Sequence, residues 1–190
     1  MKLLFLLAMP ALMFTSPAIE AAQAHVVDSN VALYQGTRLN YVIGPPYRFR
    51  LVIDEAILDG YSLAFVDNSA TYDSAAVLIA VSIFSLGDNS FADVLASDTE
   101  SIREHYGAGL SIRPVDPVIN AVGQPVTTFF IDDKRRFIPT VMVSYYDGGT
   151  EIVIFELSIA ENYPRFVAEQ AYVDCLSRFK VLTQGPPVSD

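Results

Sequence analysis

Few side chains in this sequence have the chemistry that catalysis needs. The 190 residues include two histidines, His25 and His105, and one cysteine, Cys175. A hydrolase triad needs a base and a nucleophile within hydrogen-bond reach, and no Gly-x-Ser-x-Gly sequence supplies a serine nucleophile. His105 stands near the end of an expected helix, where the helix dipole favours a positive or polar side chain, and Cys175 falls on the apolar stripe of another helix, as a buried thiol does. We therefore expect no catalytic residue and no enzyme.

Metal binding is the alternative use of the histidines. If a leader is removed after Ala24, His25 becomes the amino terminus, and an amino-terminal histidine can chelate copper through its amine and its ring. His105 could complete such a site, so a copper-binding or copper-dependent protein stays open as an alternative. The acidic groups at 54–59 and 132–133 lack the spacing of a calcium loop and are expected to be solvated turns. No other metal site and no cofactor is expected.

The charged residues that could recognise a partner are Lys134, Arg135 and Arg136. They are three of the 12 Lys and Arg residues of a chain that has 22 Asp and Glu residues and a net charge of −10. We expect them at a turn between two strands, where they project a local positive field from a negative body. A charged turn is ordinarily only solvated, but this one could steer an acidic partner or a lipid headgroup. The three residues are predicted to form a partner-binding tip.

The start of the chain has the pattern of a signal peptide. Lys2 is followed by a short apolar run, 3–9, and then by the small residues Ala22 and Ala24, which suit signal peptidase. We expect a signal peptide over 1–24 and a protein that is exported to the periplasm or secreted. No stable membrane anchor is expected, because prolines interrupt the segment and an unbroken run of about 18 apolar residues is absent.

Composition restricts the partners and the means of stabilisation. The acidic balance argues against nucleic acid, since phosphates would be repelled at long range. One cysteine cannot form an intramolecular disulfide, so an exported domain must be stabilised by packing. We expect a monomer or small homo-oligomer that binds another protein or an envelope component.

The element that organises the chain is a hairpin from Arg136 to Ala160. Apolar residues alternate with a period of two on both sides of the turn at 147–149, which suits strands covered on one face and partly covered on the other. The Asp-Gly-Gly turn offers the positive-φ positions that tight hairpins require. Pro139 is discordant, because it cannot donate to a ladder and so implies an edge, a bulge or an unpaired position.

Two helices and further strands complete the chain. One helix is expected after Ser90, which forms a capping box with Asp93, and it carries Asp98 on its apolar stripe, so its ends are expected to be better buried than its middle. A second helix is expected after Asn162 and Pro164, with Asn162 as its cap. The other expected strands are 47–53, 61–67, 75–84, 110–113, 118–122 and 126–131.

This order predicts an α+β fold. We expect a mostly antiparallel sheet of about six to seven strands, with the two main helices packed on one face. The expected division is an N-terminal arm, 25–40, which is flexible or adds a strand, one domain over 41–182, and a disordered tail, 183–190.

The chain resembles the PsbP-like superfamily over residues 41–182. The resemblance rests on a Pro turn and extended segment at 44–49, the segment 61–67, the turn at 122–125 that opens a meander, and the ending at 178–182. The superfamily includes periplasmic DcrB-type proteins, which are the closest in texture, photosystem II extrinsic subunits and a nuclear-import factor. The resemblance implies a PsbP-like α/β sandwich, and it implies no functional residues because the superfamily is defined by its scaffold.

We therefore expect an exported, non-enzymatic accessory protein that binds a macromolecular partner in the cell envelope. An immunity-type inhibitor of a toxin is an alternative within the binding proteins, since small size, export and acidity suit it. The copper protein that uses His25 is the alternative from another class.

Overall fold

The structure is a computed structural model and describes residues 24–28, 31–35, 39–107 and 109–183. The expected signal peptide lies outside the described residues except for Ala24, and the expected tail lies outside them from 184 onward. Within the described ranges, no helix is both long and apolar enough to cross a membrane.

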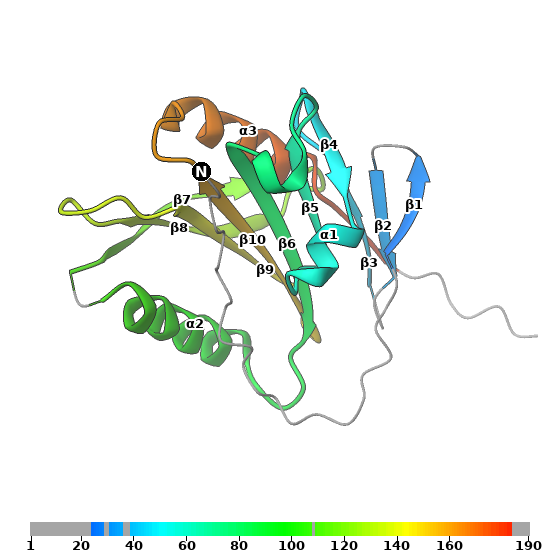
Figure 1. Ribbon diagram of the computed structural model, residues 1–190. Helices are drawn as coiled ribbons and strands as arrows, with labels where there is room; N and C mark the ends of the chain where they lie inside the picture. Colours follow the sequence, from blue (N-terminus) through cyan, green and yellow to red (C-terminus); the bar gives the residue numbers. More distant parts are fainter. Residues whose placement is uncertain (1–23, 29–30, 36–38, 108, 184–190) are drawn as a thin grey trace, which may run out of the picture.

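The main sheet has seven strands in the order β4-β5-β6-β10-β9-β8-β7 (Figure 1). Every neighbouring pair is antiparallel. The expected α+β class and the expected six to seven antiparallel strands are therefore confirmed. The strands are β4 Phe49–Val52, β5 Leu63–Asp67, β6 Val77–Ser85, β7 Ser111–Ile119, β8 Pro125–Asp132, β9 Thr140–Asp147 and β10 Glu151–Ile159.

Strands β9 and β10 form the expected hairpin. Its turn places Gly149 at a φ of 83°, and the backbone N–H of Gly149 donates to Oδ1 of Asp147 over 2.8 Å. Because β9 begins at Thr140, Pro139 lies just outside the strand. Its carbonyl accepts a hydrogen bond from the backbone N–H of Ile159 over 2.9 Å. The register of β9 and β10 shifts between Leu157 and Ser158, which fits the bulge that was one of the expected alternatives near Pro139.

The two main helices, α2 Phe91–Tyr106 and α3 Arg165–Arg178, cover opposite faces of the main sheet (Figure 1). Phe155 of β10 packs in the same cluster as Tyr172 of α3. The adjacent Ile154, which points to the other face, packs in the cluster that α2 covers. The expectation that both helices pack on one face is therefore wrong. Both faces of the hairpin are apolar, so each needs its own cover.

A second sheet has four antiparallel strands in the order β1-β2-β3-β11. The N-terminal stretch thus adds strands, which was one of its two expected alternatives. Tyr41 of β3 stacks on Phe179, with ring centroids 6.0 Å apart, and both belong to the core on the α3 side. The strands are β1 Ala24–Asp28, β2 Val31–Gln35, β3 Leu39–Ile43 and β11 Lys180–Thr183.

Element boundaries differ from expectation in a few places. Ser90 caps α2 as expected, but α3 has Pro164 as its N-cap residue without a side-chain cap, so the expected cap at Asn162 is wrong. The two short strands expected around Pro114 and Pro117 are one strand, β7, with an irregular register between Val115 and Val118. The structure adds the short helices α1 Asp54–Leu58 and η1 Tyr72–Ser74.

Candidate functional site

The loop that joins β8 to β9, residues 133–137, carries the predicted partner-binding residues and is named the basic loop. The side chains of Lys134, Arg135, Arg136 and Phe137 are all exposed. In Figure 1 this loop forms the far tip of the sheet, beyond the C-terminal end of α2. The expected turn is confirmed, and the binding role of its residues stays a prediction.

Asp133 holds the basic loop in shape from the inside. Its side chain is only 4% exposed. Oδ1 accepts from the backbone N–H of Arg135 over 2.9 Å and from Nε of Arg135 over 3.3 Å, and Oδ2 lies 3.5 Å from Nε of Arg136. The backbone N–H of Arg135, together with these guanidinium groups, holds the pKa of Asp133 below its usual value. The expectation of a fully solvated acidic turn at 132–133 is therefore wrong for Asp133, whose carboxylate binds the loop's own donors.

The two arginines of the basic loop lie against the link between α2 and β7. The guanidinium of Arg135 covers Gly109 so closely that a Cβ at this position would collide with it. The guanidinium of Arg136 lies 3.9 Å from where a Cβ of Gly107 would stand. The last turn of α2 adds the basic residues Arg103 and His105, and Arg103 forms an ion pair with Glu100 over 3.5 Å. The basic loop and the end of α2 therefore form one surface.

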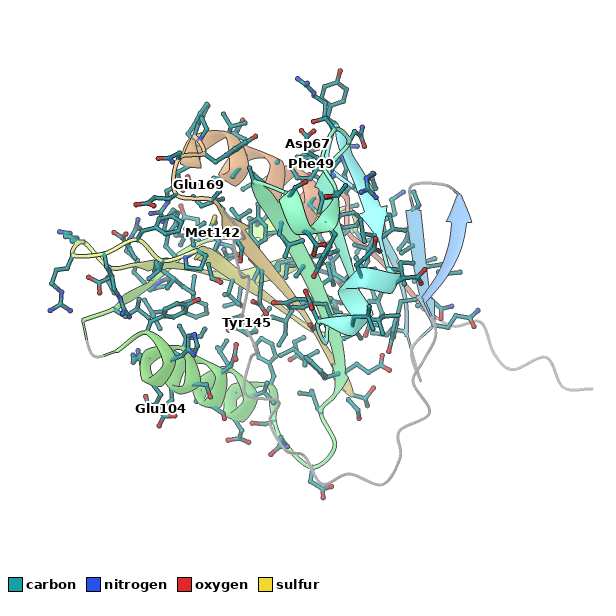
Figure 2. All side chains as sticks on the ribbon, in the orientation of Figure 1. Phe49, Asp67, Glu104, Met142, Tyr145 and Glu169 are labelled. Atoms are coloured by element: carbon teal, nitrogen blue, oxygen red, sulfur yellow. The ribbon has the colours of Figure 1, made fainter. Side chains whose placement is uncertain are left out.

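A buried acidic pair lies between α2 and the main sheet. Asp98 is the buried residue of α2, with 2% exposure, and Glu156 of β10 is 5% exposed. The expectation that the middle of this helix is the less buried part is therefore wrong. The hydroxyl of Tyr145 donates to Oδ2 of Asp98, and Figure 2 shows Tyr145 on the side of the sheet that faces α2. Among the described residues, Oδ1 of Asp98 and Oε1 of Glu156 have no hydrogen-bond partner.

Burial governs the charge of this pair. Removal from water raises the pKa of Glu156, and the nearby Asp98 raises it further, to about 8. Burial also raises the pKa of Asp98, although the hydrogen bond from Tyr145 opposes this rise. A carboxyl group whose pKa is raised binds its proton more tightly, so burial beside Asp98 favours the neutral form of Glu156.

Hydroxyl groups extend this polar layer toward the end of α2. Thr140 and Ser158 share a hydrogen bond of 3.2 Å between their side-chain oxygens, and the hydroxyl of Tyr106 donates to Thr140 over 3.5 Å. A hollow of about 430 Å³ lies along β7, beside residues 113–116. It is lined by other residues than the acidic pair, whose side chains are buried between α2 and the sheet.

The cysteine and the histidines that were considered for catalysis or metal binding lie in different surroundings. Cys175 is fully buried, and burial raises its pKa well above the usual range, so the thiol is kept neutral. His105 is exposed, and its ring lies 4.8 Å from that of Tyr106. The copper alternative rests on His25, whose side chain lies outside the described part of the chain. Nowhere in that part do three or more His, Cys, Asp or Glu residues form a group that could hold a metal.

The proximity of Asp98 and Glu156 was not predicted from the sequence. Two signals were present, because Asp98 interrupts the apolar stripe of its helix and Glu156 interrupts a long apolar strand. Neither signal shows that the two residues meet, since 58 positions separate them in the printed sequence and only the docking of α2 brings them together. The role of Asp133 was missed because a turn carboxylate is ordinarily solvated.

Comparisons with known proteins address the fold. No family model matches the sequence, and a search of curated proteins also finds no match. Among solved structures, the chain is similar to the solution structure of cyanobacterial PsbP (CyanoP) from Synechocystis sp. PCC 6803, with 15% identity and a TM-score of 0.46, over 88% of this chain and 98% of that chain. The likeness is one of fold alone.

Proposed function

We propose that this protein is an exported, non-enzymatic accessory protein that binds an acidic protein partner in the cell envelope through the basic loop. The observation that carries the proposal is the exposure of Lys134, Arg135 and Arg136 on a loop whose shape is fixed from within by Asp133. The proposal includes a relationship to the periplasmic DcrB-type proteins, because those proteins share the compartment expected for this chain.

Preorganisation favours a binding role over an ordinary charged turn. A flexible arginine loses side-chain entropy when it binds, and a loop already held in its bound shape loses less. Asp133 fixes the backbone at Arg135, and the backbone N–H of Arg136 donates to the carbonyl of Asp133 over 3.2 Å. The exposed ring of Phe137 stands next to these charges, and an aromatic residue beside an arginine is a common composition of interface hot spots.

The charge distribution favours a protein over a membrane as the partner. The whole chain has a net charge of −10, so an extended anionic membrane would repel most of the molecule while it attracted the tip. An acidic patch on a protein can be as small as the basic loop itself. Planar guanidinium groups also match carboxylates in geometry, and Nε of Arg135 and Nε of Arg136 each lie within 3.5 Å of a carboxylate oxygen of Asp133.

The proposal predicts that reversal of the loop's charge removes partner binding. In capture experiments from envelope extract, the triple variant Lys134→Glu, Arg135→Glu, Arg136→Glu should lose proteins that the wild type retains. With a captured partner, the variant should associate about tenfold more slowly at low salt, and the difference should shrink as salt approaches about 0.15 M. Surface plasmon resonance at several salt concentrations measures both effects.

A second triple variant controls for net charge. Arg48, Arg178 and Lys180 are also exposed and lie on other elements, so their reversal to Glu changes the net charge equally and leaves the basic loop intact. This control should bind like the wild type. If both variants lose the same proteins, binding depends on overall charge and the basic loop is a solvated turn. If the loop variant loses binding only to anionic vesicles, the partner is a membrane.

A further inference from the structure

The interface between α2 and the main sheet combines a thin apolar contact with two buried carboxyl groups. The apolar residues of α2, which include Val94, Leu95 and Ile102, are only partly buried against the sheet. Asp98 is the residue of the helix that the contact fully buries, and Glu156 projects from β10 on the same side. Unpartnered buried oxygens on both residues mean that full ionisation of this pair opposes the docking of α2.

The groups around Glu156 do not compensate its charge. Asp98 and Tyr106 face it from α2, Tyr145 faces it from β9, and Tyr61 and Tyr172 interact with it from the segment before β5 and from α3. None of these groups is positively charged at pH 7. Arg136 interacts with Tyr106, but it is not among the groups that shift the pKa of Glu156. Two carboxyl groups are also too few for a typical divalent cation site. A proton is therefore the cation that suits the pair.

We propose that α2 is a proton-dependent latch. When the Asp98–Glu156 pair carries a proton, α2 stays docked on the sheet, and when both carboxyl groups are ionised, α2 is released. The inference does not depend on what the basic loop binds. When α2 lifts, Glu156 meets water and regains the ordinary behaviour of a glutamate, so docking and proton uptake are linked.

The sign of the linkage fixes the pH range. In the docked form, burial and the nearby Asp98 raise the pKa of Glu156 from 4.5 to about 8. Below about pH 4.5 both forms are protonated and docking does not depend on this group. Between about pH 4.5 and 8 the docked form alone keeps the proton, so release becomes about tenfold easier per pH unit. Above about pH 8 both forms are ionised, and the effect of this group levels off.

Native-state hydrogen exchange from pH 5 to 9 tests the latch, with each rate expressed as a protection factor so that the chemical pH dependence is removed. Amides of α2 should be less protected than those of β10, which lies at the centre of the sheet, at every pH. Their protection should fall about a hundredfold between pH 6 and 8 and then level off. Equal protection of α2 and β10 at every pH would show that α2 opens only when the whole molecule unfolds, and would overturn the proposal.

Two variants assign the effect to the pair. Glu156→Gln should lose most of the fall in α2 protection between pH 6 and 8, whereas Glu104→Gln should behave like the wild type, because Glu104 lies on the exposed side of the same helix (Figure 2). Asp98→Asn removes a neighbouring negative charge, so the levelling should move to lower pH. An unchanged profile in Glu156→Gln would overturn the proposal. If that variant does not fold, carboxyl NMR of wild-type Glu156 serves instead, and a midpoint near 4.5 would overturn it.

Discussion

At the scale of single residues, the surroundings of a carboxylate decide what it does in this chain. Asp133 and Asp98 are both buried, yet their pKa values shift in opposite directions. Asp133 receives a backbone N–H and two guanidinium groups, which stabilise its charge. Asp98 loses its contact with water and receives a single hydrogen bond from the phenol of Tyr145, so desolvation dominates and its pKa rises. The donors within reach therefore separate a loop anchor from a proton-binding pair.

Cys175 gives a prediction at the same scale. The thiol is fully buried beneath α3, with Sγ 3.7 Å from the carbonyl oxygen of Gly44, and burial raises its pKa. A disulfide reagent should therefore modify the native protein at least about a thousandfold more slowly than the guanidinium-unfolded protein, because reaction requires opening of the core. A kinetic thiol assay measures the two rates. Comparable rates would place Cys175 on an accessible surface and contradict the packing described.

At the scale of elements, the stability of α2 depends on its N-terminal cap more than the stability of a deeply buried helix does. Its apolar residues are only partly buried, so packing contributes less, and the capping box at Ser90 contributes a larger share. Oγ of Ser90 accepts from the backbone N–H of Asp93 over 3.2 Å, and Oδ2 of Asp93 accepts from the backbone N–H of Ser90 over 3.1 Å. These reciprocal bonds satisfy donors that the first turn leaves open.

Substitution of the cap should therefore destabilise the protein. Ser90→Ala should lower the free energy of unfolding by about 1 kcal/mol, measured by urea denaturation followed by circular dichroism. Ser101→Ala is the matched control, because Ser101 lies inside α2 and alanine is the better helix former there. Equal destabilisation by the two substitutions would mean that the loss arises from the helix surface rather than from its cap.

At the scale of the whole molecule, charge is distributed unevenly. An acidic chain of net charge −10 places three adjacent basic residues on the far tip of its main sheet (Figure 1), next to the last turn of α2 with Arg103 and His105. If the proposed acidic partner binds here, we expect this arrangement to orient its approach toward one end and to act mainly on the association rate.

Export is the other prediction that concerns the whole chain. The small residues Ala22 and Ala24 place the cut before His25, so the exported protein should begin at His25. Intact-mass measurement of protein recovered from the periplasm or medium would show this directly. A mass that retains residues 1–24 would contradict the cleavage. If the mass shows a chain that begins at His25, copper titration of this protein tests the alternative that uses His25.

The sequence by itself determined the elements that depend on neighbours along the chain. The hairpin of β9 and β10 follows from alternation and from the Asp-Gly-Gly turn, the start of α2 from Ser90 and Asp93, and the buried stripe of α3 from the spacing of its apolar residues. These signals act over a few positions, so the α+β class and the antiparallel sheet could be predicted.

The tertiary structure alone decided which faces and side chains meet. Alternation shows that both faces of β10 are apolar, but not that α2 covers one face and α3 the other, because the path of a connection is not encoded in the periodicity of the strand. The pairing of Asp98 with Glu156 and the burial of Asp133 follow from those paths. Whether a carboxylate is hydrated, donor-bound or isolated depends on groups distant in sequence, and these surroundings set its pKa and hence its role.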